Sequence, residues 1–406
     1  MDYPVFRDEM KKDYTILIPD MLPVHFKLII NILKKYGYNI VLLQTSTREV
    51  VDEGLKNVHN DTCYPALLVI GQFINALKSG KYDVNKTALM LTQTGGGCRA
   101  SNYIHLLRKA LKKEFPQVPV ISLNLSGLEK GTGLSLTLPM LVKVVYAVFY
   151  GDLLMSLYNQ CKPYELNSGD SEKTREKWQQ KLSTVFDKRE FLKYKKYCRL
   201  ILDDFAKIKR SSEKKIRVGI VGEIYVKYSP LANNHLEEFL LSEGCEPIVP
   251  ALMEFVMYCL AGSVADSKLY QFSNQKILVS KIGYSFIHKI QKGIIKVINE
   301  HGVFEAPHDF EHIKKLADKY MSLGVNMGEG WLIPAEMAAL AETGTENIIC
   351  TQPFGCLPNH IVAKGMSRVI KEAYPDANIV AIDYDPGATK VNQENRIKLM
   401  LANAKK

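Results

Sequence analysis

The sequence predicts an α/β protein with two halves, each built around a doubly wound parallel sheet. Short apolar runs alternate with helical periods in the first half, and the same alternation restarts at Ile216 after a strongly basic stretch. At 406 residues the chain also exceeds one ordinary hydrophobic core. We therefore expect a Rossmann-like domain over residues 1–165, a basic helical connector over 166–214 and a second Rossmann-like domain over 215–406.

Each half contains four expected strands. In the first half the strands cover 15–18, 40–43, 88–92 and 118–123, and the helices cover 26–36, 66–77 and the residues after Ser101. In the second half the strands cover 216–222, 247–249, 347–350 and 378–382, with helices over 236–241 and after Pro358. The pattern between about 253 and 323 is helical throughout, which predicts a helical insertion into the second half.

The positive charge of the chain is concentrated in one segment. Residues 188–217 contain 12 Lys and Arg against 4 Asp and Glu, which accounts for most of the net charge of +10. An apolar helical stripe runs through the same segment and makes Cys198 a core residue. The charges fit either a solvated helix face and linker, or a docking patch for an acidic partner or a phosphate-bearing substrate. No nucleic-acid-binding motif accompanies them, so we expect no nucleic-acid partner.

The most apolar stretch, residues 138–158, resembles a membrane span in composition. Lys143 and Asp152 interrupt it and Gly151 breaks it, so we expect a buried helix and no membrane association. The eight cysteines are too sparse for a disulfide scaffold, and no charged leader precedes an apolar run at the N-terminus. We therefore expect a cytoplasmic protein with free thiols.

Three cysteines lie on turns rich in glycine or proline. Cys98 follows three glycines just beyond an expected strand end, and Cys356 follows a Pro-Phe-Gly turn. Cys63 precedes an expected helix, whose dipole favours the thiolate. Because ligand sites in open α/β sheets form at the carboxyl ends of the strands, we expect these thiols to be presented there, with Cys98 unburied.

Thiolates on such turns suit iron–sulfur ligation. Small residues let the inorganic core approach, and they leave backbone N–H groups for its sulfides. Three thiolates would leave one iron open. The alternative for any single cysteine is a small buried hydrophobe, which fits Cys161, Cys198, Cys245 and Cys259. Cys350 ends an expected strand beside the Cys356 turn, and we keep it in reserve as a further ligand.

The glycine run before Cys98 allows two interpretations. Gly96 and Gly97 would let a cluster approach the backbone closely. The same run, followed by a helix, could instead cradle a phosphate on its amides. No complete mononucleotide or dinucleotide motif occurs in the chain, so nucleotide binding with structural cysteines is the alternative, and ATP hydrolysis by this chain is not expected.

Two polar segments offer groups that could act on a substrate. Tyr225 follows the strand that opens the second half, in a segment that is either substrate-facing or a structural turn. Glu329 lies between two glycines and could act as a general acid or base if burial or a neighbouring cluster moved its pKa. Helix capping is the alternative for Glu329, because an apolar helical run follows from Leu332.

Five longer motifs occur in order along nearly the whole chain. They cover residues 60–66, 92–103, 222–225, 352–360 and 382–388, and they include the three turn cysteines. Together they resemble the 2-hydroxyacyl-CoA dehydratase D-component family. The closest branch is the one found alone or fused behind ATPase activators, which is related to the double-cubane cluster proteins.

The resemblance implies that Cys63, Cys98 and Cys356 hold a 4Fe-4S cluster between the two Rossmann-like domains. It also implies a separate ATP-hydrolysing activator protein, with its own iron–sulfur cluster, that delivers a low-potential electron. In the dehydratases this electron converts the acyl-CoA thioester to a ketyl radical anion, which then expels the 2-hydroxyl group.

The same resemblance leaves the substrate and the assembly open. Dehydratases pair two unlike subunits, which implies a heterodimer. A homodimer of this chain is the alternative. In the double-cubane branch the cluster is part of an 8Fe-9S unit that reduces small molecules, which here would enlist Cys350, Cys259 or a second subunit. The alternatives are an acyl-CoA dehydratase, a double-cubane reductase, and a non-catalytic electron-transfer or scaffold subunit of an activase assembly.

Overall fold

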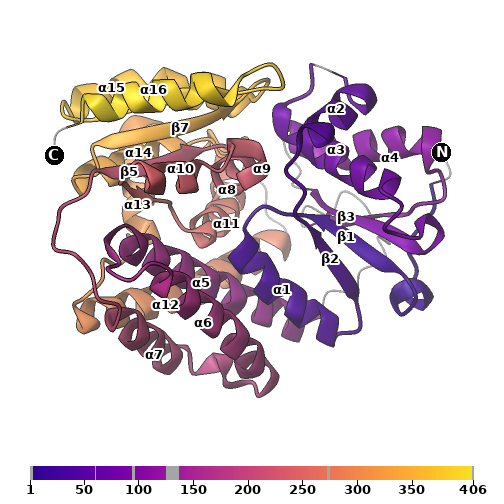
Figure 1. Cartoon of the computed structure of the whole chain (residues 1–406), viewed down its shortest axis with the longest axis horizontal. Helices are drawn as coiled ribbons and strands as arrows, with labels where there is room; N and C mark the ends of the chain where they lie inside the picture. Colours follow the sequence, from indigo (N-terminus) through magenta and orange to yellow (C-terminus); the bar gives the residue numbers. More distant parts are fainter. Residues whose placement is uncertain (1–2, 60, 94–96, 125–136, 272–274, 405–406) are drawn as a thin grey trace.

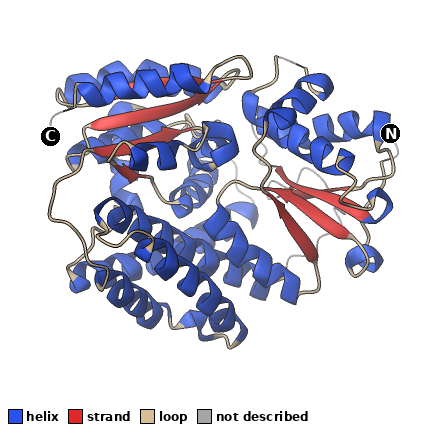
Figure 2. Cartoon of the chain, in the orientation of Figure 1, coloured by secondary structure: helices blue, strands red, loops and turns tan. Residues whose placement is uncertain are grey.

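The structure is a computed structural model that describes residues 3–59, 61–93, 97–124, 137–271 and 275–404. In these residues it contains two four-stranded parallel sheets flanked by helices, which confirms the predicted α/β fold with two Rossmann-like halves. The two sheets lie apart, one in each half of the molecule (Figures 1 and 2).

The N-terminal sheet has the strand order β2-β1-β3-β4, with every pair parallel. Its elements are β1 (Thr15–Pro19), α1 (Pro23–Lys35), β2 (Asn39–Leu43), α2 (Arg48–Asn57), α3 (Tyr64–Lys78), β3 (Thr87–Gln93), α4 (Tyr103–Glu114) and β4 (Val120–Asn124). The four strands match the predicted ones to about two residues at their starts. The pattern does not predict α2, because this helix is mostly polar and buries only Val50, Val51 and Gly54.

The C-terminal sheet repeats this topology with the order β6-β5-β7-β8. Its elements are β5 (Arg217–Gly222), α8 (Ile224–Tyr228), α9 (Pro230–Asn233), α10 (Leu236–Ser242), β6 (Glu246–Ile248), β7 (Asn347–Pro353), a π-helical turn (Asn359–Ala363), α15 (Lys364–Ala373), β8 (Asn378–Tyr384) and α16 (Lys390–Ala402). In each sheet the first strand lies between the second and the third. The connections on the two sides of this strand therefore run in opposite directions across the sheet. At such a point a ligand crevice is expected, here at the carboxyl ends of β1 and β3 in one sheet and of β5 and β7 in the other.

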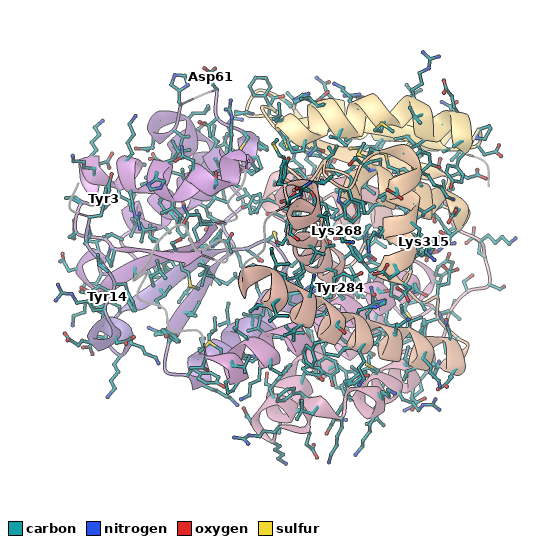
Figure 3. All side chains as sticks on the ribbon, turned by 180° about the vertical axis from the view of Figure 1, so that it is seen from behind. Tyr3, Tyr14, Asp61, Lys268, Tyr284 and Lys315 are labelled. Atoms are coloured by element: carbon teal, nitrogen blue, oxygen red, sulfur yellow. The ribbon has the colours of Figure 1, made fainter. Side chains whose placement is uncertain are left out.

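A layer of long helices packs against the C-terminal sheet and α1. It contains α5 (Leu138–Cys161), α6 (Asp170–Asp187), α7 (Tyr194–Ala206), α11 (Leu252–Leu269), α12 (Gln275–His301), α13 (Phe310–Tyr320) and α14 (Leu332–Glu342). Because α5 packs on α1 and α7, and α12 packs on α7 and α11, helices from the connector and from the second half form one layer. Figure 3 shows Lys268, Tyr284 and Lys315 of this layer on the side away from Tyr3 and Tyr14 of the N-terminal domain.

The segment Leu138–Tyr164, which includes α5, is the one described helix long and apolar enough to cross a membrane by length and composition. In the fold, 67% of its most apolar window is buried. Asp152 in its middle accepts a hydrogen bond from His25 and binds the first backbone N–H groups of α11, at Leu252 and Met253. As predicted, α5 packs as a buried core helix.

Buried side chains also join the two halves. One continuous apolar cluster includes Leu17 and Leu89 of the N-terminal sheet together with Ile220 and Ile349 of the C-terminal sheet. Cys198 belongs to the core of the helical layer and is 1% exposed, as its place on the apolar stripe predicts. The two sheets are therefore joined by a shared apolar core, and the loops at their strand ends lie beside this core.

Candidate functional site

The turn cysteines Cys98 and Cys356 occupy equivalent positions in the two halves. Cys98 follows β3 and Cys356 follows β7, and these strands have the same place in their respective sheets. Cys63 directly precedes the first turn of α3. Both halves therefore contribute a cysteine at the end where a crevice is expected.

Backbone contacts bring the loops of Cys63 and Cys356 together. The N–H of Tyr64 donates to the carbonyl oxygen of Phe354, at 3.1 Å. Gly355 has a φ of +73°, and a Cβ at this position would lie 3.2 Å from the Cα of Cys63. A glycine is therefore required here both by the backbone conformation and by the close approach of the second loop.

The loop of Gly328 covers the Cys98 side of the same site. A Cβ on Gly328 would lie 3.8 Å from Cys98 Sγ and 2.6 Å from Pro358 Cγ. A Cβ on Gly97 would lie 2.5 Å from Met327 Sδ. Loops from both halves therefore close on Cys98, and they do so through glycines that leave room for their neighbours.

Each of the three turn sulfurs has a hydrogen-bond donor beside it. The pairs are Tyr103 Oη with Cys63 Sγ at 2.8 Å, the Ala100 N–H with Cys98 Sγ at 3.5 Å, and Asn359 Nδ2 with Cys356 Sγ at 3.2 Å. The Ala100 N–H and the Asn359 amide donate to sulfur, whereas either atom of the Tyr103–Cys63 pair can be the donor. Donation to sulfur is the arrangement that stabilises a thiolate.

Three other cysteines show the opposite polarity. Their S–H groups donate to oxygen, in the pairs Cys161 with the Phe205 carbonyl, Cys245 with the Glu243 carbonyl, and Cys350 with Asn359 Oδ1. The direction of the hydrogen bond therefore separates Cys98 and Cys356 from these core cysteines.

The turn thiols are less accessible than the sequence predicts. Cys63 and Cys356 are buried, and Cys98 is half-buried. Burial raises the pKa of all three thiols, that of Cys98 to about 12. The expectation of a thiolate favoured at Cys63 is therefore wrong, because desolvation outweighs the helix dipole. The expectation that Cys98 is not buried is met in part, because the residue is half-buried.

Two glutamates, the buried Glu329 and the half-buried Glu223, lie near the cysteine loops. Their charges add to the burial that raises the pKa values of Cys98 and Cys356. Burial, followed by the charge of Glu329, raises the pKa of Glu223 to about 8, and burial also raises the pKa of Glu329. The pair therefore holds a proton at neutral pH.

Glu329 joins two loops and does not cap the helix that follows it, α14. Its Oε1 accepts the backbone N–H of Ile224 at 2.9 Å, which ties the segment before α14 to the start of α8. The N-terminus of α14 has no side-chain cap. The capping interpretation of Glu329 is therefore wrong. The carboxyl group that does cap a helix here is that of Glu223, which accepts the N–H of Val226 in α8 at 2.8 Å.

The remaining predicted positions fall in different surroundings. Tyr225 lies in α8 with its side chain buried, and burial raises its pKa. Cys350 lies inside β7, which continues to Pro353, so the expectation that it ends a strand is wrong. Cys259 in α11 is exposed and is not the buried hydrophobe expected. Gly96 lies outside the described residues.

A buried lysine that sequence reasoning missed lies behind the glutamates. Lys227 is 2% exposed and donates to both carboxylate oxygens of Glu336, at 2.9 and 3.2 Å. Its charge opposes the pKa increase that burial causes in each of four glutamates, which are Glu223, Glu254, Glu329 and Glu336.

Within the described part of the chain, no group of three or more His, Cys, Asp or Glu side chains is placed to hold a single metal ion. No protein-family model matches the chain, and no curated protein matches it either. By its fold this is an α/β protein with two Rossmann-like halves. Three sulfurs with hydrogen-bond partners lie where loops of the two halves meet, beside two glutamates whose pKa values are raised.

Proposed function

We propose that this is an iron–sulfur protein of the 2-hydroxyacyl-CoA dehydratase type. Cys63, Cys98 and Cys356 would hold a 4Fe-4S cluster between the two halves. The observation that carries the proposal is the donor beside each of these three sulfurs, because cluster thiolates are stabilised and tuned by such hydrogen bonds.

The residues present suit a cluster in their chemistry and in their backbone geometry. All three proposed ligands are thiols, which iron–sulfur clusters use. Gly328 and Gly355 leave no side chain where the loops of Cys98 and Cys63 approach their neighbours. A cluster binds each cysteine through a different iron, so it does not require three donors around one point.

When bound, the cluster would supply a low-potential one-electron centre with one iron free of cysteine. The protein itself would supply a proton for the reaction and the groups that surround the substrate. Glu223 holds a proton at neutral pH, because its pKa is raised to about 8, so it could deliver one to a departing hydroxyl group. Glu329 and Tyr225 remain proposed catalytic groups, and the Ile224 N–H fixes the position of the Glu329 carboxyl group.

The proposed electron donor is an ATP-hydrolysing activator protein with its own cluster, and the proposed setting is a cytoplasmic dimer. Lys188, Lys193 and Lys195, in and beside α7, are exposed and offer a basic face. In Figure 1, α7 lies at the end of the molecule away from α3 and α8. This face therefore suits an acidic partner better than the phosphates of an acyl-CoA bound at the cysteine turns.

Electron paramagnetic resonance of the anaerobically reduced protein tests this function. For a dehydratase, adding a 2-hydroxyacyl-CoA changes the spectrum, and with the activator and ATP the dehydrated acyl-CoA is found by mass spectrometry. A spectrum that no acyl-CoA alters, in a protein that the activator still reduces, would instead identify an electron-transfer subunit. Cys98→Ser should abolish the signal, whereas the matched Cys245→Ser variant should retain it.

A further inference from the structure

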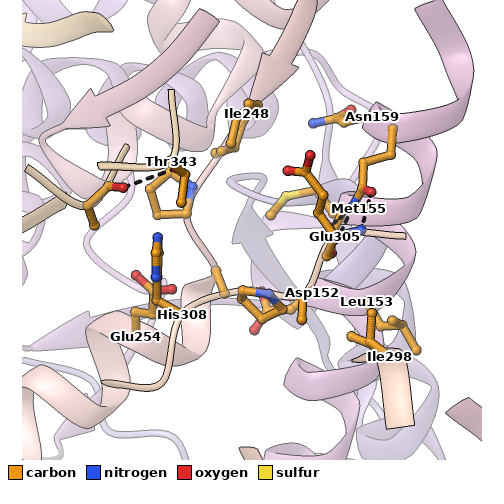
Figure 4. Close-up of a pocket in the computed structure, with 18 of the residues that line it drawn as sticks. Asp152, Leu153, Met155, Asn159, Ile248, Glu254, Ile298, Glu305, His308 and Thr343 are labelled. Carbon is orange, nitrogen blue, oxygen red and sulfur yellow. Dashed lines mark hydrogen bonds between the residues drawn. The ribbon is translucent and has the colours of Figure 1, made fainter. Parts of the chain in front are cut away.

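A cavity of about 170 Å³ lies between the helical layer and the β6 edge of the C-terminal sheet. This volume compares with cavities that hold a benzene-sized molecule. Figure 4 shows Leu153 and Met155 of α5, Ile248 of β6 and Ile298 of α12 in its wall. It is separate from the cysteine turns, because none of Cys63, Cys98 and Cys356 lines it.

Acidic side chains outnumber basic ones in the lining of this cavity. The carboxyl groups are those of Asp152, Glu246, Glu254, Glu305 and Glu336, against the basic Arg217 and His308. An excess of one charge in a partly apolar cavity favours a ligand of the opposite charge.

Four of these five carboxyl groups already have partners. Asp152 pairs with His25 and the start of α11, Glu336 with Lys227, Glu246 with the Tyr164 hydroxyl, and Glu305 with Arg217. The carboxyl group of Glu254 has no hydrogen bond to any described residue, although its residue is only 5% exposed.

The lone carboxyl group of Glu254 is costly to ionise. Burial, with the charges of Glu336 and Asp152 added and that of Lys227 opposing, raises its pKa to about 8. Two more buried acceptors in the lining, Asn159 Oδ1 and Thr345 Oγ1, also have no partner among the described residues. The Glu254 carboxyl group and the Asn159 oxygen therefore have no donor among the described residues, and a cation beside Glu254 would supply one.

We propose that this cavity binds a small organic amine, whose ammonium group pairs with Glu254 and whose apolar body fills the space between Leu153, Ile248 and Ile298. An ammonium group carries three donors and a positive charge, which match the unpaired carboxyl group and the excess of acids. The proposal rests on no part of the function proposed for the cysteine turns, so it applies equally to iron-free protein.

Isothermal titration calorimetry with cyclohexylamine and cyclohexanol tests this inference. The two probes have the same ring, which is about the size that the cavity holds. The amine should bind at least about tenfold more tightly than the alcohol, because the alcohol brings no charge to Glu254. Equal affinity of the two probes, or no binding of the amine at about 10 mM, would overturn the proposal.

Two variants locate the binding. Glu254→Gln keeps the shape and removes the charge, so the amine should bind about tenfold more weakly or worse, while cyclohexanol binds unchanged. Glu305→Gln is the matched control, because Glu305 lines the same cavity but is mostly exposed and pairs with Arg217. Leu153→Trp should exclude both probes by filling the cavity. Unchanged amine binding in a folded Glu254→Gln variant would place the amine elsewhere and contradict the proposal.

Discussion

Lys227 Nζ lies 2.9 Å from Glu336 Oε1, and neither side chain is more than 3% exposed. This ion pair lies between the cavity beside the helical layer and the loop of Glu223. Glu336 lines the cavity beside the helical layer, whereas Lys227 follows the loop of Glu223, which faces the cysteine turns. The buried charge of Lys227 therefore stabilises the ionised form of acidic groups both at the cavity and near the cysteine turns.

Replacement of Lys227 by Met should destabilise the protein strongly. The variant leaves the Glu336 carboxylate buried without its partner, and breaking a buried pair costs about 3–5 kcal/mol. The measurement is the free energy of unfolding from urea denaturation. The double variant Lys227→Met with Glu336→Leu should recover most of the loss, because no charge then remains unpaired. A loss below about 1 kcal/mol in the single variant would contradict the burial of this charge.

Glu254→Gln should stabilise the protein increasingly as the pH rises. The unfolded carboxyl group titrates near its ordinary pKa of 4.5, whereas burial raises the native pKa to about 8. Between these values the native state binds more protons, so this group lowers the stability of the wild type as the pH increases. Relative to wild type, the free energy of unfolding of the variant should be similar near pH 4 and higher by on the order of 4 kcal/mol at pH 8. The exposed Glu305→Gln control should show no such trend.

Tyr103→Phe should lower the reduction potential of the proposed cluster. The Tyr103 hydroxyl group lies 2.8 Å from Cys63 Sγ, and a donor at sulfur stabilises the more negative reduced state. Losing one hydrogen bond of about 1 kcal/mol corresponds to about 40 mV for one electron. A redox titration followed by absorbance measures this shift. Tyr146→Phe, which lies in the helical core, should leave the potential unchanged, and equal potentials in all three proteins would argue against the Cys63 assignment.

Gly355→Ala and Gly344→Ala separate backbone strain from the close approach of the loops. Both glycines have a positive φ, +73° and +75°, so both variants should lose about 1–2 kcal/mol of stability. A Cβ at position 344 meets nothing within 4 Å, whereas one at position 355 meets the backbone of Cys63. Only Gly355→Ala should therefore lower the iron content. Equal iron content in the two variants would show that the Cys63 and Cys356 loops need not approach each other.

The strands could be predicted from the sequence because buried parallel strands are short apolar runs with turns between them. The C-terminal end of β7 could not be predicted in this way. Thr351 and Gln352 look polar, yet both are fully buried and continue the strand beyond Cys350, because they hydrogen-bond to Val221, His360 and Asp383. Long-range pairing of polar side chains leaves no periodic signal in the sequence.

The local sequence marks the three turn cysteines but not the acids around them. Glycine and proline turns marked Cys63, Cys98 and Cys356 from local sequence alone. Glu329 looked like a cap because its partner, the Ile224 N–H, comes from a segment 105 residues away. Lys227 was missed because, without the fold, a buried lysine has the same appearance as the many exposed ones.

The iron and acid-labile sulfide content of anaerobically purified protein shows whether the three turn cysteines hold a cluster. We expect about four iron and four sulfide per chain in the wild type and in Cys245→Ser, and almost none in a folded Cys63→Ser, Cys98→Ser, Cys356→Ser triple variant. A wild type that stays free of iron after anaerobic reconstitution, or a triple variant that retains the wild-type content, would contradict this assignment.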